Sequence, residues 1–422
     1  MRRATITLVS LLLASASYAQ APETAAEPDR AGVPDASGTD PSDVPGQMQG
    51  QDPKAVRLTI TGNIVEPKAM TPDASKLVVP DGFEVSTFAT GLGNARMIAV
   101  SDDGLVYVTR RKGGDVILLR DEDGNGTADG EPRVVARNDM MHGIAIDGDT
   151  AYLVAVNEVF RAPIAEDGSL GELEVIADGL PEGGQHPNKT LALGPDGALY
   201  VSSGSTCNAC DETSDENATM LRMGTEPGSE RTIFASGLRN TIGFAFHPQD
   251  GSLWGLDHGI DWLGDDEQPE ELNRIEEGKI YGWPYVYADG QFNPQDYPPE
   301  GTMAEWAAKS TDPVRLYTPH AAPMQMAFNT GDGFPDDYDG DAFAAMRGSW
   351  NRSPPSGYEV VRIDFEDGQP TAIEPFVTGF LSEADGEFSQ MGRLAGLAFM
   401  PDGSMLFSDD ENGILYRVTA SN

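Results

Sequence analysis

The sequence predicts an all-β fold, namely a six-bladed β-propeller of four-stranded antiparallel blades. Three observations predict it: a sixfold repeat, short strands bounded by Asp-Gly turns, and the lack of any long segment with a helical apolar period. The repeated phrase is an apolar residue, an alanine and another apolar residue, followed by an Asp/Gly-rich turn and a second apolar run. A repeat of about fifty residues indicates an array of equivalent units. The six alanines are Ala99, Ala145, Ala192, Ala245, Ala327 and Ala398.

The strands of each unit follow from the residues around the turns. Runs such as DGDTAYLVAV and GPDGALYVSS place β-branched and aromatic residues beside Asp-Gly turns, which is typical of hairpins. Roughly 340 residues shared among six units allow four short strands each, as in a propeller blade. The fourth and fifth units are longer and carry insertions at 257–320 and 330–340. Long insertions in a propeller are usually functional loops.

The N-terminal region reads as an export leader followed by a linker. Arg2 and Arg3 precede the apolar run 6–14, and Ser17-Tyr18-Ala19 fits a cleavage site. No segment approaches the ~20 apolar residues of a membrane span. The mature protein is therefore expected to be periplasmic or secreted. The predicted order is signal peptide 1–19, disordered acidic and Pro-rich linker 20–55, lead-in segment 56–75 and propeller domain 76–422.

The net charge of the chain is −40 at pH 7. Such a chain repels nucleic acid and anionic membranes, so neither is an expected partner. The abundant Asp and Glu serve solubility and make calcium a candidate structural ligand. Against this acidic background, a cluster of arginines and histidines needs a reason to be together.

A basic or titratable residue precedes each repeated alanine by three to seven positions. Loops entering the innermost strands of a propeller share one face, so these residues should converge at the channel mouth. Singly, each is best read as a salt bridge or loop anchor, but together they favour an anionic ligand. The six are Arg96, His142, His186, Arg239, His320 and Arg393.

Two cysteines occur, Cys207 and Cys210, in the run CNAC. This spacing is compatible with redox or metal chemistry, but zinc needs two further ligands. No histidine follows Cys210, so covalent haem attachment is unsupported. In an oxidising compartment a local disulfide is the favoured interpretation.

Several segments together resemble the soluble, pyrroloquinoline quinone (PQQ)-dependent sugar dehydrogenases, and most closely the L-sorbosone and aldose sugar dehydrogenase branch. The resemblance covers about residues 76–420. The segments that carry it are GGQHPNKTLALGPDGALYVSSG, GSTCNAC, SGLRNTIGFAFHPQDG, LGDDEQPEELNRI…YGWP, HAAPMQMAF, RGSWNRSPPSGY and MGRLAGLAFMPDGSMLFSDDENGILYRV.

The resemblance implies roles for several residues. His186 matches the general base that takes the hydroxyl proton while hydride passes to the quinone. Arg239 matches the residue that polarises the quinone carbonyl, and Asn240 a cofactor hydrogen-bond donor. Trp350 is expected at the substrate rim, where His142 and His320 have no assigned task. Further contacts with PQQ are expected from Arg96, Gln185, Arg352 and Arg393.

Calcium that holds PQQ in this family is ligated largely by backbone carbonyls, which the resemblance carries to Gly259 and Ile260. A neighbouring acidic run is read either as a second calcium site or as a solvated loop. Its members are Asp265, Asp266, Glu270 and Glu271.

A separate acidic loop resembles a calcium loop of the EF-hand type, with oxygen ligands at positions one, three, five and nine. Position twelve is Pro132, so the bidentate acid is missing, and Glu131 is one residue early. We expect a structural calcium loop between strands. Its ligands would be Asp121, Asp123, Asn125 and Asp129.

The expected activity is thus a periplasmic, PQQ- and calcium-dependent oxidation of an aldose or a sorbosone-like aldehyde. With no haem motif present, electrons must pass to a separate acceptor, a cytochrome or a quinone. Arg347 stands where histidine is expected and His258 where asparagine or glutamine is commoner, which leaves the sugar undefined. One alternative is a calcium-dependent, lactonase-like hydrolase, which would place several carboxylate or asparagine side chains at the channel mouth. The other is a non-catalytic extracellular binding propeller, which would lack His186 or Arg239.

Overall fold

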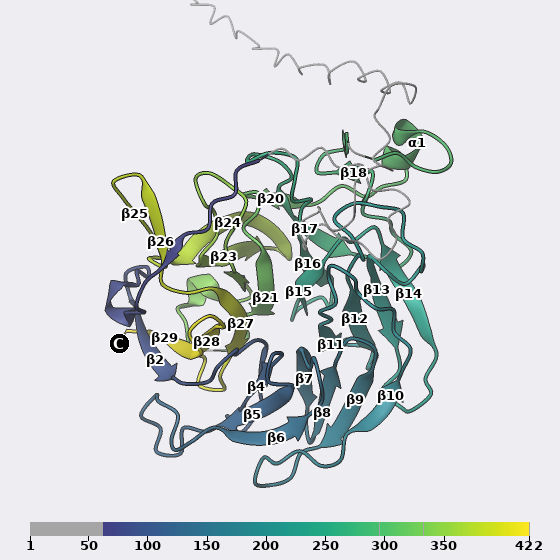
Figure 1. Ribbon diagram of the computed structural model, residues 1–422. Coiled ribbons are helices and arrows are strands. Elements are labelled where there is room, and N and C mark those ends of the chain that lie inside the picture. The colour runs from purple at the N-terminus through teal and green to yellow at the C-terminus, as the bar shows by residue number, and fades with distance from the viewer. Residues whose placement is uncertain (1–61, 295, 332, 422) are drawn as a thin grey trace, which may run out of the picture. The chain divides into compact units, whose positions relative to one another are not determined.

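The computed structural model describes residues 62–294, 296–331 and 333–421. The predicted signal peptide 1–19, the linker 20–55 and positions 56–61 of the lead-in lie outside the described residues. The described chain is nearly all β-structure and contains six four-stranded antiparallel sheets (Figure 1). The predicted all-β class and the four-stranded antiparallel sheets are therefore confirmed.

The first three sheets follow one another along the chain, each an uninterrupted run of four strands. They comprise β3 (Ile98–Val100), β4 (Val106–Arg110), β5 (Asp115–Leu119) and β6 (Arg133–Arg137); β7 (Gly143–Asp147), β8 (Thr150–Val154), β9 (Val159–Pro163) and β10 (Glu174–Ala177); and β11 (Leu191–Leu193), β12 (Leu199–Ser203), β13 (Thr219–Met223) and β14 (Arg231–Ser236).

The other three sheets contain an insertion or a strand from the opposite end of the chain. They comprise β15 (Thr241–Phe246), β16 (Leu253–Asp257), β17 (Glu270–Ile275) and β20 (Arg315–Tyr317); β21 (Pro323–Phe328), β22 (Ala342–Met346), β23 (Glu359–Glu366) and β24 (Gln369–Val377); and β27 (Leu394–Phe399), β28 (Met405–Asp409), β29 (Ile414–Ala420) and β2 (Phe83–Ala89).

The last sheet joins the two ends of the described chain. Strand β2 pairs antiparallel with β29, so that Phe83 lies opposite Ala420. Phe83 also packs edge-to-face on Phe334 and Phe376, with ring centroids 4.8 and 5.1 Å apart. Such aromatic pairs stabilise by roughly 0.5–1.5 kcal/mol beyond the area they bury, so this contact holds β2 against the neighbouring sheet.

The first strands of the sheets carry the repeated alanines and lie against the next sheet in cyclic order. Contacts join β3 to β7, β7 to β11, β15 to the sheet of β12, β15 to β21, β21 to β27, and β27 back to β3. Glycines two residues before three of the alanines allow this approach. A Cβ at Gly243 would overlap the carbonyl oxygen of Met324, and one at Gly396 would overlap that of Arg96. The close approach of neighbouring sheets therefore depends mainly on these glycines, and less on the alanines.

The insertions and the lead-in form small elements outside the six sheets. Between β17 and β20 lie β18 (Val286–Tyr287), β19 (Gln291–Phe292) and the short helix α1 (Met303–Ala307), which starts with a capping box between Thr302 and Glu305. The second insertion holds the 3-10 turn η6 (Asp336–Tyr338). Another small sheet joins β1 (Lys68–Ala69), β26 (Glu387–Gln390) and β25 (Leu381–Ala384), and the 3-10 turn η5 (Ala74–Lys76) follows β1. None of the helices in the described part of the chain is long and apolar enough to cross a membrane.

Candidate functional site

The loops that precede the inner strands enclose a cavity of about 750 Å³. Ligand pockets commonly have volumes of about 300–1,000 Å³. Of the six residues predicted to converge, Arg96, His186, Arg239 and Arg393 line it. Gln185, Asn240 and Trp350, also predicted, line the same cavity. The sixfold repeat therefore predicts where the cavity lies, although only four of the six basic residues line it.

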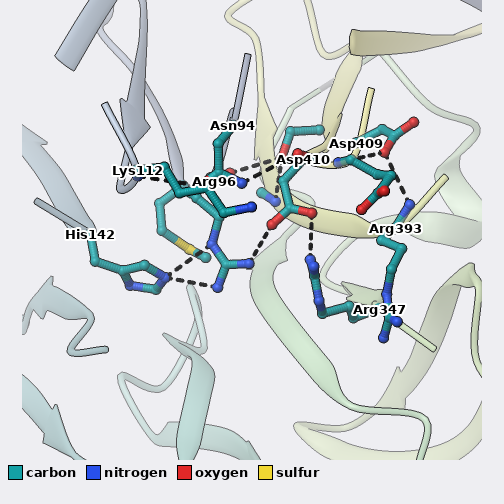
Figure 2. A network of polar contacts seen from close by, with 12 residues as sticks. Asn94, Arg96, Lys112, His142, Arg347, Arg393, Asp409 and Asp410 are labelled. Carbon is teal, nitrogen blue, oxygen red and sulfur yellow. Dashed lines mark hydrogen bonds and ion pairs between the residues drawn. The ribbon is translucent and has the colours of Figure 1, made fainter. Parts of the chain in front are cut away.

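His142 lies behind the cavity rather than at its rim. Its Nδ1 lies 3.0 Å from the carbonyl oxygen of Lys189, which can only accept, so Nδ1 carries the proton. Its Nε2 then accepts from Nη2 of Arg96 at 3.1 Å, as Figure 2 shows. Burial, and next the charge of Arg96, hold the pKa of His142 well below its ordinary value. The structure thus places His142 as a neutral acceptor that orients Arg96.

Two other predicted residues do not line the cavity. His320 is buried, with its Nε2 2.8 Å from the carbonyl oxygen of Gly264. Arg352 donates to the carbonyl oxygens of Asp265 and Pro354, at 2.8 and 2.5 Å. Both side chains are held by neighbouring loops because backbone acceptors there satisfy them, so neither occupies the position that we expected.

Asp410, which the sequence analysis missed, links three cavity arginines. Its carboxylate accepts from Arg96 at 2.5 Å and from Arg347 at 2.6 Å, while its backbone N–H donates to the carbonyl oxygen of Arg393 at 3.0 Å (Figure 2). Asp410 and Arg96 are 314 residues apart in the sequence, so no local pattern could have paired them. Only 2% of the Asp410 side chain is exposed.

Replacing Asp410 with asparagine is expected to lower the free energy of unfolding by about 3 kcal/mol, because it leaves buried arginine charge uncompensated. Urea denaturation of the two proteins measures the difference. The matched control is Asp196→Asn, which breaks a more exposed ion pair to Arg222 and should cost under about 1 kcal/mol. Equal losses for the two variants would contradict the structural role assigned to Asp410.

His186 is held as the tautomer that a general base requires. Its Nδ1 lies 3.1 Å from the carbonyl oxygen of Ser205 and 2.8 Å from the hydroxyl of Ser205. That hydroxyl donates to the carbonyl oxygen of Cys207 at 2.7 Å, so it too must accept from His186. Nδ1 therefore bears the proton, and Nε2 keeps a free lone pair on a residue that lines the cavity.

Burial, followed by the charges of Arg239 and His258, holds the pKa of His186 well below its ordinary value. Burial likewise lowers the pKa of His258 to about 4. Because desolvation disfavours the charged imidazole, we expect His142, His186 and His258 to be neutral at pH 6. A titration of imidazole ¹⁵N shifts by NMR tests this in the ligand-free chain. Protonation of His186 with a midpoint at or above pH 6.5 would contradict it.

The guanidinium of Arg239 is nearly saturated by the protein. Nε and Nη2 donate to the backbone and side-chain oxygens of Asn208, at 2.9 and 2.7 Å. Nη2 also donates to Asp261 at 2.9 Å, and Nη1 reaches the carbonyl oxygen of His258 at 3.4 Å. A guanidinium has five N–H groups, so one hydrogen of Nη1 remains for a group in the cavity. Asn208 and Asp261 were not among the predicted site residues.

The cavity carries an excess of positive charge. It is lined by five arginines and one aspartate, and a second aspartate, Asp410, pairs with two of the arginines. Five positive and two negative charges leave three net positive charges in a chain of net charge −40. The five arginines are Arg96, Arg111, Arg239, Arg347 and Arg393.

Some polar atoms around this cavity have no hydrogen-bond partner among the described residues. They are buried atoms of cavity-lining side chains, and unpaired buried polar groups are rare unless a ligand or water completes them. Both donors and acceptors occur among them, which suits a ligand with oxygen atoms and N–H groups. They are Nε of Arg111, Nε of Arg393, Oε1 of Gln185 and Oδ1 of Asn188.

The segment expected to ligate calcium has its N–H groups fixed by acidic and amide side chains. Gly259 N donates to Glu270 at 2.9 Å, and Ile260 N donates to Gln268 at 3.0 Å. The carbonyl oxygens of Gly259 and Ile260 accept no hydrogen bond from the described residues, so they are available to a cation. This arrangement fits backbone ligation of calcium.

The acidic run after this segment does not form one cluster. Glu270 and Glu271 are buried and accept backbone N–H groups, from Ala322 and Ala288 respectively. Asp265 accepts from Asn63, and the carboxylate of Asp266 is 93% exposed. The structure therefore separates the four predicted ligands into two buried structural acceptors and two outer loop residues.

The separate acidic loop does bring its carboxylates together. Ligand atoms of Asp121, Asp123 and Asp129 all lie within 4.8 Å of one another. The side-chain oxygen of Asn125 instead accepts from the backbone N–H of Thr127 at 2.9 Å. Calcium binding by this loop stays a prediction.

Cys207 and Cys210 are joined by a disulfide. The local disulfide predicted from the CNAC run is therefore confirmed, and neither cysteine is left as a thiolate that could bind a metal. The disulfide lies beside Ile260 and Trp283 in a small buried cluster. It thus packs against the segment expected to ligate calcium.

Fold and site together define an all-β protein with an arginine-lined cavity beside a buried histidine. The model of the TrAA12-like family matches residues 77–421. The chain therefore belongs to the TrAA12-like family, and the resemblance to soluble PQQ-dependent sugar dehydrogenases is confirmed.

Individual relatives differ in how much of their length they share with the chain. A PQQ-dependent sugar dehydrogenase of Hypocrea jecorina is 24% identical over 404 residues, covering 82% of this chain and 89% of that protein. An uncharacterised protein of Borreliella burgdorferi is 37% identical over 189 residues, covering 44% of this chain, which spans only 48% of that protein. The calcium structure of a Trichoderma reesei enzyme of carbohydrate-active family AA12 superposes with a TM-score of 0.72 and 23% identity, over 86% of this chain and 100% of that one.

Proposed function

We propose that this chain is a PQQ- and calcium-dependent dehydrogenase that oxidises a sugar hydroxyl or a sugar aldehyde. The observation that carries the proposal is the cavity, where three net positive charges surround a histidine held neutral with a free Nε2. The sugar dehydrogenase among its relatives supports the same assignment. Electrons leave to a separate acceptor, a cytochrome or a quinone.

The cavity residues fit the chemistry of PQQ, which carries three carboxylates and an ortho-quinone. Arg96 and Arg393 bind carboxylates, with Arg111 and Arg347 beside them in the same lining. Gln185 and Asn240 supply amide groups, and the carbonyl oxygens of Gly259 and Ile260 hold the calcium ion. The three net positive charges of the cavity, together with those of the calcium ion, outweigh the three carboxylates of PQQ, so the site attracts this anion.

Two residues act on the substrate side. Nε2 of His186 takes the proton of the substrate hydroxyl, because its lone pair is kept free by the hydrogen bonds at Nδ1. The remaining N–H of Arg239 stabilises negative charge that develops in the cavity. When bound, PQQ supplies the ortho-quinone that accepts a hydride. Trp350, which also lines the cavity, forms part of the substrate rim.

Other parts of the chain determine the fold around this site, the location of the protein and a structural calcium site. We propose that the six four-stranded sheets are the six blades of a β-propeller, because neighbouring sheets contact one another in a closed cyclic order, mostly through their first strands. The leader at 1–19 directs the chain to the periplasm or outside the cell. The loop at Asp121, Asp123, Asn125 and Asp129 binds a structural calcium ion.

The alternatives fit the cavity less well. A lactonase-like hydrolase needs several carboxylate or amide side chains around a bare metal. Three amide side chains do line the cavity, those of Gln185, Asn188 and Asn240, but five arginines beside them would repel a bare cation. Among the described residues, Asp261 is the only carboxylate that lines the cavity, and it is paired with Arg239. A non-catalytic binding propeller has no need for a buried, neutral histidine with a defined tautomer.

The test is an activity assay on the mature chain loaded with calcium and PQQ. An artificial electron acceptor dye is supplied with a panel of aldoses, and with sorbosone as the aldehyde. Dye reduction that needs both PQQ and a sugar supports the proposal. Hydrolysis of a lactone panel without PQQ would instead support the hydrolase, and absence of both activities would support the binding protein.

A further inference from the structure

One short loop contacts both residues to which catalytic roles are proposed. We call Ser205–Cys210 the disulfide loop, since its last residue is bonded to Cys207. Ser205 accepts from Nδ1 of His186, and Asn208 accepts from Nε and Nη2 of Arg239. His186 and Arg239 lie on two different loops, one before β11 and one before β15, and the disulfide loop contacts both of them.

Asn208 determines which edge of the Arg239 guanidinium faces the cavity. Its backbone and side-chain oxygens together occupy the Nε–Nη2 edge, at 2.9 and 2.7 Å. The side chain also accepts from the backbone N–H of Asp261 at 3.0 Å, and Asp261 in turn accepts from Nη2. Because that edge is closed on all sides by protein, only Nη1 can address a ligand.

A hydrogen bond connects the residue that contacts His186 to the residue beside Asn208. The hydroxyl that accepts from His186 donates to the carbonyl oxygen of Cys207, the residue directly before Asn208. The carbonyl oxygen of Asn208 accepts a further hydrogen bond from Nε1 of Trp283, at 3.2 Å. Asn208 is buried, so these bonds are sheltered from water. The disulfide closes the loop immediately on both sides of Asn208 and Ala209.

We propose that Asn208 is the positioning residue for Arg239, and that the Cys207–Cys210 disulfide holds Asn208 in the conformation that this requires. The catalytic consequence rests on the function proposed above, whereas the structural consequence does not. A guanidinium free to rotate would present its fork at varying angles to the reacting group. Misplacement of a catalytic group by about 1 Å can cost on the order of a hundredfold in rate.

The test uses four variants of the full mature chain. Asn208→Ala removes the side-chain acceptor, and Asn208→Asp keeps an oxygen at the same place. The double variant Cys207→Ala/Cys210→Ala opens the loop. The control is Thr219→Val, which removes a buried hydrogen bond, to the carbonyl oxygen of Glu216, outside the loop.

The first readout is hydrogen exchange of the Arg239 guanidinium, with Nη2–H and Nε–H followed separately by ¹⁵N-resolved NMR in the chain without cofactor. Asn208→Ala removes the side-chain acceptor of Nη2, so we expect at least about tenfold faster exchange of Nη2–H. The double cysteine variant frees the whole loop, including the backbone acceptor of Nε, so we expect faster exchange of both groups. Asn208→Asp and Thr219→Val should exchange at the wild-type rate. The second readout is kinetic: kcat should fall about tenfold or more in the first two variants, with KM within about twofold.

Two results would overturn the proposal. One is wild-type exchange of the Arg239 Nη2–H in both Asn208→Ala and the double cysteine variant. The other is an equal loss of kcat in Thr219→Val, which would mean that general loosening and not the position of Arg239 matters. If wild-type protein binds no PQQ by calorimetry, the proposed function fails, but the exchange measurement still decides on Asn208.

Discussion

Replacing His186 with asparagine is expected to lower kcat about a thousandfold while leaving the affinity for PQQ within about twofold of wild type. The amide nitrogen of asparagine can replace Nδ1 as the donor to Ser205, so the loop should keep its shape. What the variant lacks is the lone pair at Nε2, which takes the proton in the proposed reaction. Steady-state kinetics with a dye acceptor, together with calorimetric titration of PQQ, measures both quantities.

The control for this prediction is His247→Gln. His247 is a buried histidine that pairs with Asp250 and packs on Phe328, and it does not line the cavity. Its replacement should leave kcat within about twofold. A His186→Asn protein that keeps a tenth or more of the wild-type kcat would contradict the role of His186 as the base.

Replacing Arg239 with lysine is expected to lower kcat by about a hundredfold or more, even though the positive charge is retained. A lysine ammonium cannot occupy both oxygens of Asn208 and the carboxylate of Asp261 in the plane that the guanidinium fills. The ammonium group would hydrogen-bond to one of these acceptors, and no N–H group would be held in a fixed direction toward the cavity. Kinetics at saturating PQQ separates this loss from a loss of cofactor binding.

Arg111→Lys is the matched control for Arg239→Lys. Arg111 also lines the cavity, but its Nε has no partner among the described residues, so the position does not depend on a planar fork. Its replacement should change the affinity for PQQ more than kcat. If Arg239→Lys were to keep kcat within threefold of wild type, the need for a fixed guanidinium would be refuted.

The sequence was enough to predict the fold class because local chemistry encodes it. Asp-Gly turns between short apolar runs set the hairpins, and the repeat of the phrase around Ala99 set the number of units. The same repeat predicted that Arg96, His186, Arg239 and Arg393 converge, since each precedes the first strand of its own sheet.

What the repeat could not predict is what each side chain meets after the chain has folded. His142 occupies the same place in the phrase as His186, yet Lys189 and Arg96 satisfy both of its ring nitrogens. Asp410 and Asn208 come from other loops and carry no repeat signal of their own. Their importance arises only from contacts with arginines that are distant in sequence.

The calcium assignments show a related limit. A backbone carbonyl ligand, the role proposed for Gly259, does not depend on the identity of the side chain, so the sequence contains little evidence for it. Carboxylate residues are easy to recognise in a sequence, but their role is not. Glu270, for example, is a buried acceptor for the backbone N–H groups of Gly259 and Ala322. An acidic run therefore predicts where oxygen atoms gather, and not what they hold.

The central claim is that the arginine-lined cavity binds PQQ through its three carboxylates. Calorimetric titration of the calcium-loaded mature chain with PQQ, and in parallel with the trimethyl ester of PQQ, tests it most directly. The ester keeps the quinone and removes the charges, so it should bind at least about a hundredfold more weakly, since each charge-assisted hydrogen bond contributes about 1.5–3 kcal/mol. Saturable binding of one PQQ per chain with little binding of the ester is the predicted result. Equal affinities for the acid and the ester, or no binding of PQQ, would contradict the claim.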